Sequence, residues 1–183
     1  MKCTASRTRR LIGPAIAAIL AATLVPAVAS TDASAQPGDV VGLINAQRTQ
    51  RGLPALTVNS ALNTAAQQHA AAAVQLKWWG PGQDSHTNPQ TGSTPQSRIM
   101  GAGYCPNPRS WQVAEITYTG WGTSGTPSAA VRWWMNSPGH RANILSGTLR
   151  EIGSAALAGS ADRAGAGASG AATYVVTFGR CQR

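Results

Sequence analysis

The feature that most constrains this chain is a turn between two apolar runs, at residues 133–145, with the sequence WWMNSPGHRANIL. Pro138 cannot continue the helix that the preceding residues predict, and Gly139 permits a reversed backbone direction. Trp133 and Trp134 supply large apolar rings that can anchor the junction. We therefore predict a helix, a tight turn and a second short helix that presents His140 to a cleft. The alternative is an ordinary buried turn in which His140 is simply a satisfied polar residue.

The first part of the chain has the composition of an export signal. A basic segment at residues 2–10 precedes an apolar run at residues 11–28, and Ala-Ser-Ala offers a cleavage site before Gln36. We therefore interpret residues 1–35 as a secretory signal peptide and residues 36–183 as the mature, secreted domain. Cleavage after Ala29 and an uncleaved membrane anchor are the alternatives. After cleavage, no apolar run is long enough to predict a stable membrane span.

Charge and cysteine content limit the partners and the compartment. Without residues 1–35, eleven of the fifteen Lys and Arg and five of the six acids remain, a net charge of +6. The basic residues are scattered singly, whereas nucleic-acid surfaces cluster them, so nucleic acid is not an expected partner. Cys3 leaves with the signal, and the remaining even count in an exported chain predicts a disulfide between Cys105 and Cys181. Two free buried thiols are the alternative.

The mature sequence mixes helical and extended patterns, with most helices before the strands. His69 falls on the alanine-rich apolar face of the second predicted helix, as a core histidine would. An Ala-, Gly- and Ser-rich stretch predicts a flexible hairpin loop before the last strand. Together these patterns predict an α+β fold. The predicted helices are residues 39–51, 60–73, 94–103 and 126–135, the strands are 113–121, 152–157 and 174–178, and the hairpin loop is 158–172.

Three polar residues stand apart from this pattern: His86 in a long loop, Glu115 inside a strand, and His140 at the turn. A carboxylate in an apolar strand is costly unless it is paired or hydrogen-bonded. We therefore predict that His86 and His140 face one another across a pocket, with Glu115 within hydrogen-bonding reach of one ring. Imidazole and carboxylate are also zinc ligands, so a zinc ion bound by His86 and His140 is a hypothesis left open.

The stretch from Trp134 to Leu145 resembles the signature of the CAP superfamily. This superfamily contains cysteine-rich secretory proteins, insect venom antigens, plant pathogenesis-related proteins and bacterial secreted domains. Further similar positions span residues 39–181, and they include Asn45, Arg48, His69, Ser85, His86, Arg98, Glu115 and the sequence YVVTFG at 174–179. The resemblance implies an α-β-α sandwich with a small antiparallel sheet between helical layers. It also implies a central cleft lined by two histidines and acidic residues.

The resemblance assigns His86, Glu115 and His140 to the cleft. Arg141 is a further cleft candidate, but we favour the alternative that its charge-assisted bonds fix the turn. The family pattern has a second carboxylate after the loop histidine, but residues 87–91 contain no acid. This departure favours a secreted, non-catalytic module that binds a lipid, a sterol or a cell-envelope component, and no catalytic residue is assigned.

Two other functional hypotheses fit the same residues. One is a metal-assisted, protease-like hydrolase that uses His86, Glu115 and His140. The other is a structural clamp in which the same three groups only hold loop, sheet and helix together. Neither a Gly-x-Ser-x-Gly nor a His-Glu-x-x-His motif is present to support the hydrolase. The ligand and the oligomeric state are left open.

Overall fold

A twisted sheet with strand order β1-β3-β4-β2 lies at the centre of the fold. The computed structural model describes residues 39–183, so the predicted signal peptide at residues 1–35 lies outside the described residues. In chain order the elements are α1 (Asp39–Thr49), β1 (Thr57–Val58), α2 (Ser60–Leu76), α3 (Pro95–Gly101), β2 (Ser110–Gly120), η1 (Gly122–Ser124), α4 (Pro127–Asn136), α5 (Pro138–Ile144), β3 (Glu151–Ala158), η2 (Arg163–Gly165) and β4 (Ala172–Gln182).

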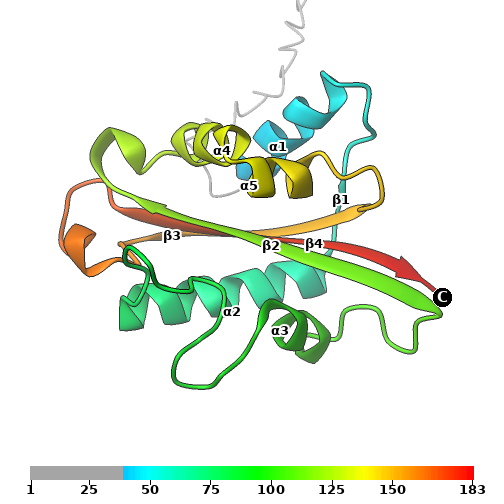
Figure 1. The fold of residues 1–183 in the computed structure, drawn as a ribbon, viewed down its shortest axis with the longest axis horizontal. Helices are drawn as coiled ribbons and strands as arrows, with labels where there is room; N and C mark the ends of the chain where they lie inside the picture. Colours follow the sequence, from blue (N-terminus) through cyan, green and yellow to red (C-terminus); the bar gives the residue numbers. More distant parts are fainter. Residues whose placement is uncertain (1–38) are drawn as a thin grey trace, which may run out of the picture. The chain divides into compact units, whose positions relative to one another are not determined.

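Helices cover both faces of this sheet, as Figure 1 shows: α2 and α3 lie on one face, and α1, α4 and α5 lie on the other. The predicted α-β-α sandwich is therefore confirmed. The sheet itself differs from the expectation, because it is mixed. Strands β2 and β3 pair with β4 in antiparallel fashion, but β1 pairs with β3 in parallel. β1 has only two residues, too few to show the alternation by which strands are recognised.

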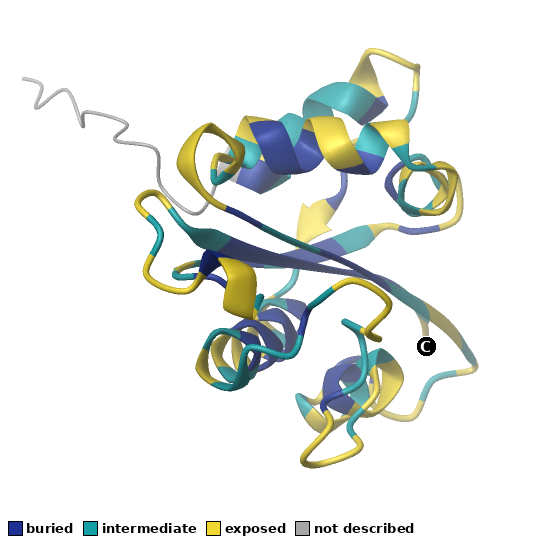
Figure 2. Cartoon of the chain, turned by 60° about the vertical axis from the view of Figure 1, so that its left-hand side comes forward, coloured by how far each residue is buried: buried dark blue, intermediate teal, exposed yellow. Residues whose placement is uncertain are grey.

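The core is divided by the sheet into two unlike halves. Large side chains such as Ile116, Trp134 and Phe178 fill the side of α1, α4 and α5. On the other side, the alanine face of α2 packs closely against the sheet. Trp79, which follows α2, belongs to the same buried cluster. Figure 2 shows the result, with buried residues on the inner sides of the helices and along the middle of the sheet. His69 lies on the close-packed alanine side, where the sequence predicted a core histidine.

Two connections differ in detail from the predictions. The first helix ends at Thr49 and not at Arg51, because the chain turns there towards Gly52, which has a positive φ of 72°. The predicted hairpin between β3 and β4 is present, but its loop is not featureless. It contains η2, capped by the Asp162 side chain, and it buries Ser160 and Ala161.

The disulfide between Cys105 and Cys181 is confirmed, with the two Cα atoms 5.5 Å apart. It fastens the connection that follows α3 to the end of β4. None of the helices in residues 39–183 combines the length and the apolar character needed to cross a bilayer.

Candidate functional site

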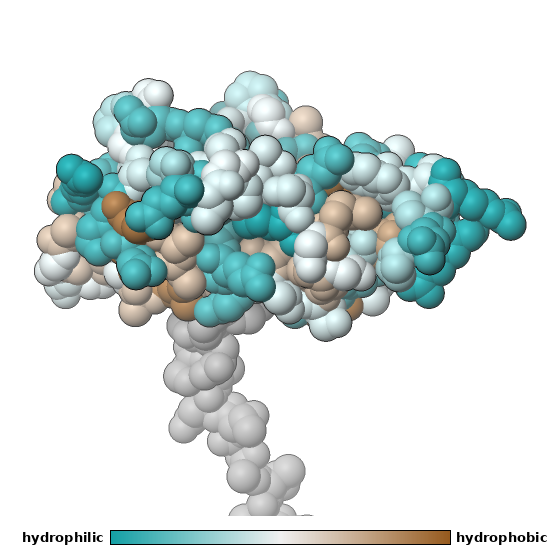
Figure 3. All heavy atoms as spheres, turned by 90° about the horizontal axis from the view of Figure 1, so that it is seen from below, coloured by the Kyte–Doolittle hydropathy of each residue, from teal (hydrophilic) through white to brown (hydrophobic). Residues whose placement is uncertain are grey.

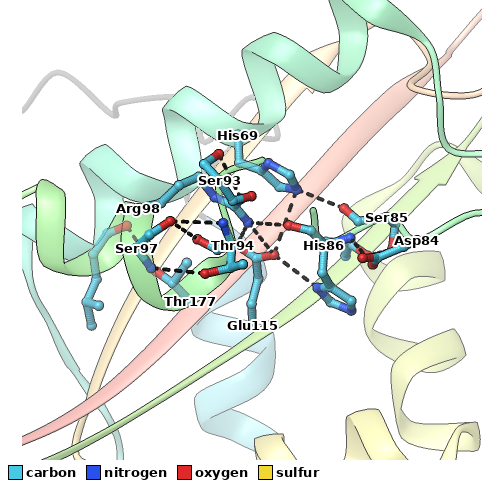
Figure 4. A network of polar contacts seen from close by, with 12 residues as sticks. His69, Asp84, Ser85, His86, Ser93, Thr94, Ser97, Arg98, Glu115 and Thr177 are labelled. Atoms are coloured by element: carbon cyan, nitrogen blue, oxygen red, sulfur yellow. Dashed lines mark hydrogen bonds and ion pairs between the residues drawn. The ribbon is translucent and has the colours of Figure 1, made fainter. Parts of the chain in front are cut away.

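The centre of the site is Glu115, a buried carboxylate in the middle of β2. Arg98 Nη2 donates to both of its oxygens at 2.9 Å, and His86 Nδ1 donates to Oε1 at 3.0 Å (Figure 4). The contact between Glu115 and a histidine was predicted from the sequence, but the main partner, Arg98, was not. A buried carboxylate that lost this guanidinium would be strongly destabilising. Arg98 is therefore the residue that allows β2 to carry Glu115 at all.

The start of α3 places Arg98 over the sheet. Thr94 and Ser97 form a reciprocal capping box, and Pro95 occupies the first turn, where its missing N–H costs nothing. One turn later, Arg98 also donates to the carbonyl oxygens of Ser93 and His86, at 2.7 and 2.8 Å. The same guanidinium thus fixes the loop that carries His86 and neutralises Glu115.

His69 of α2 lies next to the Arg98–Glu115 pair and supports the loop that carries His86. Its Nε2 atom is 2.8 Å from the carbonyl oxygen of Ser85, which can only accept, so Nε2 carries the proton. Its ring lies 5.6 Å from the Trp78 ring and 5.7 Å from the Trp79 ring. Burial lowers the pKa of His69, against the opposing effect of Glu115, so the ring is neutral at neutral pH.

His140 reaches the site from the opposite helical layer, in the first turn of α5. Its Nδ1 atom lies 2.7 Å from Ser137 Oγ, and its ring lies 4.9 Å from the Trp133 ring. Ser137 is the residue at the N-cap of α5, but its side chain makes no capping bond and holds the imidazole instead. Burial, and then the proximity of His86, lower the pKa of His140. Its ring is therefore neutral and fixed in orientation at neutral pH.

A cavity of about 420 Å³ lies between the two histidines. His86 and His140 both line it, together with aromatic rings and hydroxyl groups: Trp79, Tyr118, Trp133, Ser85, Thr117 and Thr119. On the other side of His86 a second hollow of about 660 Å³ follows β2 from Trp111 to Glu115 and reaches the start of α3. A larger hollow between α1, α2 and β3 is lined by none of the titratable side chains of residues 39–183, so it offers no acid–base group.

Arg141 lies outside the cavity between the two histidines. It is exposed, it is not among the residues that line the cavity, and it donates to the carbonyl oxygen of Met135 at 3.2 Å. This contact joins the start of α5 to the end of α4, which is the alternative role of fixing the turn. The sequence reasoning also missed Ser137, Tyr118 and Thr117 as parts of the site. The Ser-Pro-Gly turn was a signal for Ser137, but nothing marked the other two.

The residues present do not fit a resident catalytic zinc ion. Such sites use three protein ligands and keep one position open. Here His86 and His140 offer two imidazoles, while both oxygens of Glu115 are occupied by Arg98. Within residues 39–183, no group of three or more His, Cys, Asp or Glu side chains is arranged to hold a metal ion. No step of the function proposed below depends on a metal.

Comparisons with known proteins agree with this geometry. Residues 41–178 match the family described as the cysteine-rich secretory protein family, CAP. The uncharacterized protein YkwD of Bacillus subtilis (strain 168) is 29% identical over 125 residues, which cover 68% of this chain but only 44% of YkwD. This chain thus spans less than half the length of that relative.

Two solved structures share the fold at low sequence identity. An outer surface protein of Borrelia burgdorferi aligns with a TM-score of 0.59 and 21% identity, over 79% of this chain and 91% of that one. An extracellular protein of Bacillus anthracis str. Ames that contains an SCP domain aligns with a TM-score of 0.57 and 19% identity, over 79% of this chain and 39% of that one. With residues 41–178 matched and the helix–sheet–helix architecture present, this chain belongs to the cysteine-rich secretory protein (CAP) family.

Proposed function

We propose that this protein is a secreted, non-catalytic binding module that holds a lipid, a sterol or another cell-envelope component in the cleft between His86 and His140. The observation that carries the proposal is the state of Glu115. Both of its oxygens accept from Arg98, Oε1 also accepts from His86, and the side chain is only 1% exposed, so it is poorly placed to act as a general base. The cavity itself is lined by aromatic rings, by the two histidines and by several hydroxyl groups, and such a lining suits the binding of a ligand.

Export is part of this proposal. It is supported by the signal-peptide pattern of residues 1–35 and by the disulfide, since disulfides persist in oxidising compartments. The matched proteins of B. anthracis and B. burgdorferi are described as extracellular and outer surface proteins. The basic balance of residues 39–183 suits an anionic envelope.

A cleft is a better binding place than the face formed by α2 and α3. Figure 3 shows that face, on which hydrophilic and neutral residues dominate and the hydrophobic ones are scattered. Docking on a membrane through a surface requires a contiguous apolar patch. The face of α2 and α3 therefore does not favour docking on a membrane.

The test is to purify the exported protein from its own culture and to identify co-purifying small molecules by mass spectrometry. We expect a compound that is retained by the parent and lost from His140→Ala. Arg141→Ala is the matched control, because it alters the neighbouring exposed residue outside the cavity and should retain the compound. If no compound is retained, and no added lipid, sterol or envelope fraction binds the parent more tightly than His140→Ala, the proposal is wrong.

Hydrolysis is a second candidate function, favoured by one observation. Ser137 Oγ lies 2.7 Å from His140 Nδ1, the arrangement of a nucleophile beside a general base. However, no carboxylate of residues 39–183 forms an ion pair with His140, so nothing acidic orients that base. Ester and casein hydrolysis by the parent and by Ser137→Ala separate the two candidates. We expect no turnover that depends on Ser137.

A further inference from the structure

We infer that the ligand of the cleft is a linear, anionic glycan that runs along β2 across His86. This inference rests on the proposed function and names its ligand class. Its starting point is that the cavity of about 420 Å³ and the hollow of about 660 Å³ share one lining residue, His86. The His86 side chain is 36% exposed, so it separates the two hollows without sealing either from solvent.

Both hollows follow the same edge strand. β2 is at the end of the sheet, with β4 on one side and no strand of the described chain on the other. The hollow of about 660 Å³ is lined by Trp111 to Glu115, and the cavity of about 420 Å³ by Thr117 to Thr119. Eight residue steps along an antiparallel strand span about 27 Å. A site of this length suits an extended chain of several units better than a single compact molecule.

An exposed indole stands at each end of this path. Trp111 is 37% exposed and lines the hollow of about 660 Å³, while Trp133 is 49% exposed and lines the cavity of about 420 Å³. The centroid of the Trp133 ring also lies 5.5 Å from that of Tyr118 and 4.9 Å from that of His140. These two neighbouring rings hold the indole at the cavity wall. Each of the two indoles therefore presents a flat apolar ring at the edge of a hollow, where a ligand can stack on it. The apolar face of a sugar ring fits such an indole.

Between the indoles the lining is polar but not acidic. Ser85, Thr117 and Thr119 offer hydroxyl groups in the cavity, and Gln96 and Gln112 offer amides in the other hollow. Alternating rings and hydrogen-bonding groups match a glycan, which has both apolar ring faces and hydroxyl edges. The Ser85 and Thr117 hydroxyl groups bond to each other at 2.8 Å, and their remaining lone pairs can accept from the hydroxyl groups of a glycan, which a sterol has in far smaller number.

Charge favours an anionic glycan over a neutral one. Among residues 39–183, Glu115 is the one acid that lines either hollow, and Arg98 neutralises it. The exposed Arg109 lies two residues before Trp111, and the exposed Arg132 directly precedes Trp133. Both belong to the excess of basic over acidic residues in the described chain, which attracts a carboxylate-bearing chain, and the attraction should weaken as salt is added.

The test is a calorimetric titration of the exported protein with hyaluronan oligosaccharides of increasing length. We expect the affinity to rise with length until the groove is filled and to fall with added salt. Trp111→Ala and Trp133→Ala should each weaken the Kd about three- to tenfold, the effect of losing one aromatic stacking contact. Trp121→Ala is the matched control, because Trp121 is 39% exposed but lines neither hollow. Circular dichroism verifies the fold of each variant.

Three results would overturn the inference: an affinity that does not change with length, an equal loss in Trp121→Ala, or equally tight binding of poly-glutamate of matched charge. The last would mean that an acidic peptide, or charge alone, is recognised. If hyaluronan fails to bind but a compound is retained through His140, the glycan inference is wrong and the proposed function stands. If no ligand depends on His140, both are wrong.

Discussion

Arg98 is the residue on which the cleft depends most, because it neutralises Glu115 and holds the His86 loop. We expect Arg98→Met to lower the free energy of unfolding by about 3–5 kcal/mol, since it leaves a buried carboxylate without its cation. Urea denaturation measures the loss. Arg132→Met, at an exposed helix position, is the control and should change it by less than about 0.5 kcal/mol. Equal effects of the two substitutions would show that the buried pair does not stabilise the fold.

His69 gives the fold a dependence on pH. Its pKa in the folded protein is lowered, mainly by burial, whereas the unfolded chain keeps an ordinary imidazole. Below the ordinary value of about 6.5 the unfolded state takes up the proton first. The stability contributed by the neutral ring is therefore complete above that pH and is lost as the pH falls through the folded-state pKa.

The measurement is the free energy of unfolding between about pH 7.5 and about pH 5 for the parent and for His69→Gln. Glutamine can still donate to the Ser85 carbonyl oxygen but does not titrate. We expect the parent to lose more stability on acidification than the variant. Because His140 also has a lowered pKa, the difference between the two proteins is what counts, and identical pH profiles would contradict the role of His69.

At this scale, the sequence predicted the rare residues but not their pairing. All three histidines of the chain and Glu115 could be singled out, because charged and titratable groups are scarce in apolar elements. The bond from Arg98 to Glu115 joins residues 17 positions apart in two elements. It exists only because α3 packs at a particular place on the sheet, which local patterns do not encode. Arg141 follows His140 directly in the sequence but lies outside the cavity and bonds to Met135, which is the turn-fixing role that the sequence favoured.

Among the elements, α2 and β3 approach one another very closely, and Gly153 makes the approach possible. A Cβ atom at Gly153 would overlap backbone atoms of Leu62 and Asn63 in α2. We expect Gly153→Ala to lower the free energy of unfolding by about 1–3 kcal/mol or more, as other overpacked cores do. Gly147→Ala is the control, because nothing lies within 4 Å of the added atom. Comparable denaturation midpoints for the two variants would refute the close contact.

Elements with strong local signals were predicted well. The Thr-Pro pairs at residues 94–95 and 126–127 gave the starts of α3 and α4, where both threonines cap the helix. β1 was missed because two residues carry no pattern, and with it the parallel pairing. The strand order β1-β3-β4-β2 could not be predicted either, because the pairing of distant strands depends on how they pack in the core and not on the strands alone.

In the whole molecule, the cleft is shared between the two helical layers. The side of α2 and α3 supplies His69, Arg98 and the His86 loop, while α4 and α5 supply Trp133 and His140. Edge strand β2 contacts both sets: Glu115 bonds to Arg98 and His86, and the Tyr118 ring centroid lies 5.5 Å from that of Trp133. The geometry of the site therefore depends on how firmly the layers are held against the sheet. The family resemblance could place both histidines in one cleft, but not the second hollow beside β2.

The disulfide is the covalent part of that support, and its removal is the prediction that concerns the whole chain. Cys105 and Cys181 are separated by 76 residues, and the bond closes most of the sheet, with helices α4 and α5, into one loop. We expect the Cys105→Ser/Cys181→Ser double variant to lose about 4 kcal/mol of unfolding free energy, because the unfolded chain regains the freedom of a long loop.

Denaturation of the exported parent, of the reduced parent and of the double variant provides the measurement. Reduced parent and double variant should unfold at the same denaturant concentration, well below that of the oxidised parent. Cys3→Ser is the control, because Cys3 lies in the predicted signal peptide and should not affect the exported protein. A double variant as stable as the oxidised parent would show that noncovalent packing alone keeps the end of β4 in place. The disulfide would then not contribute to the support of the cleft.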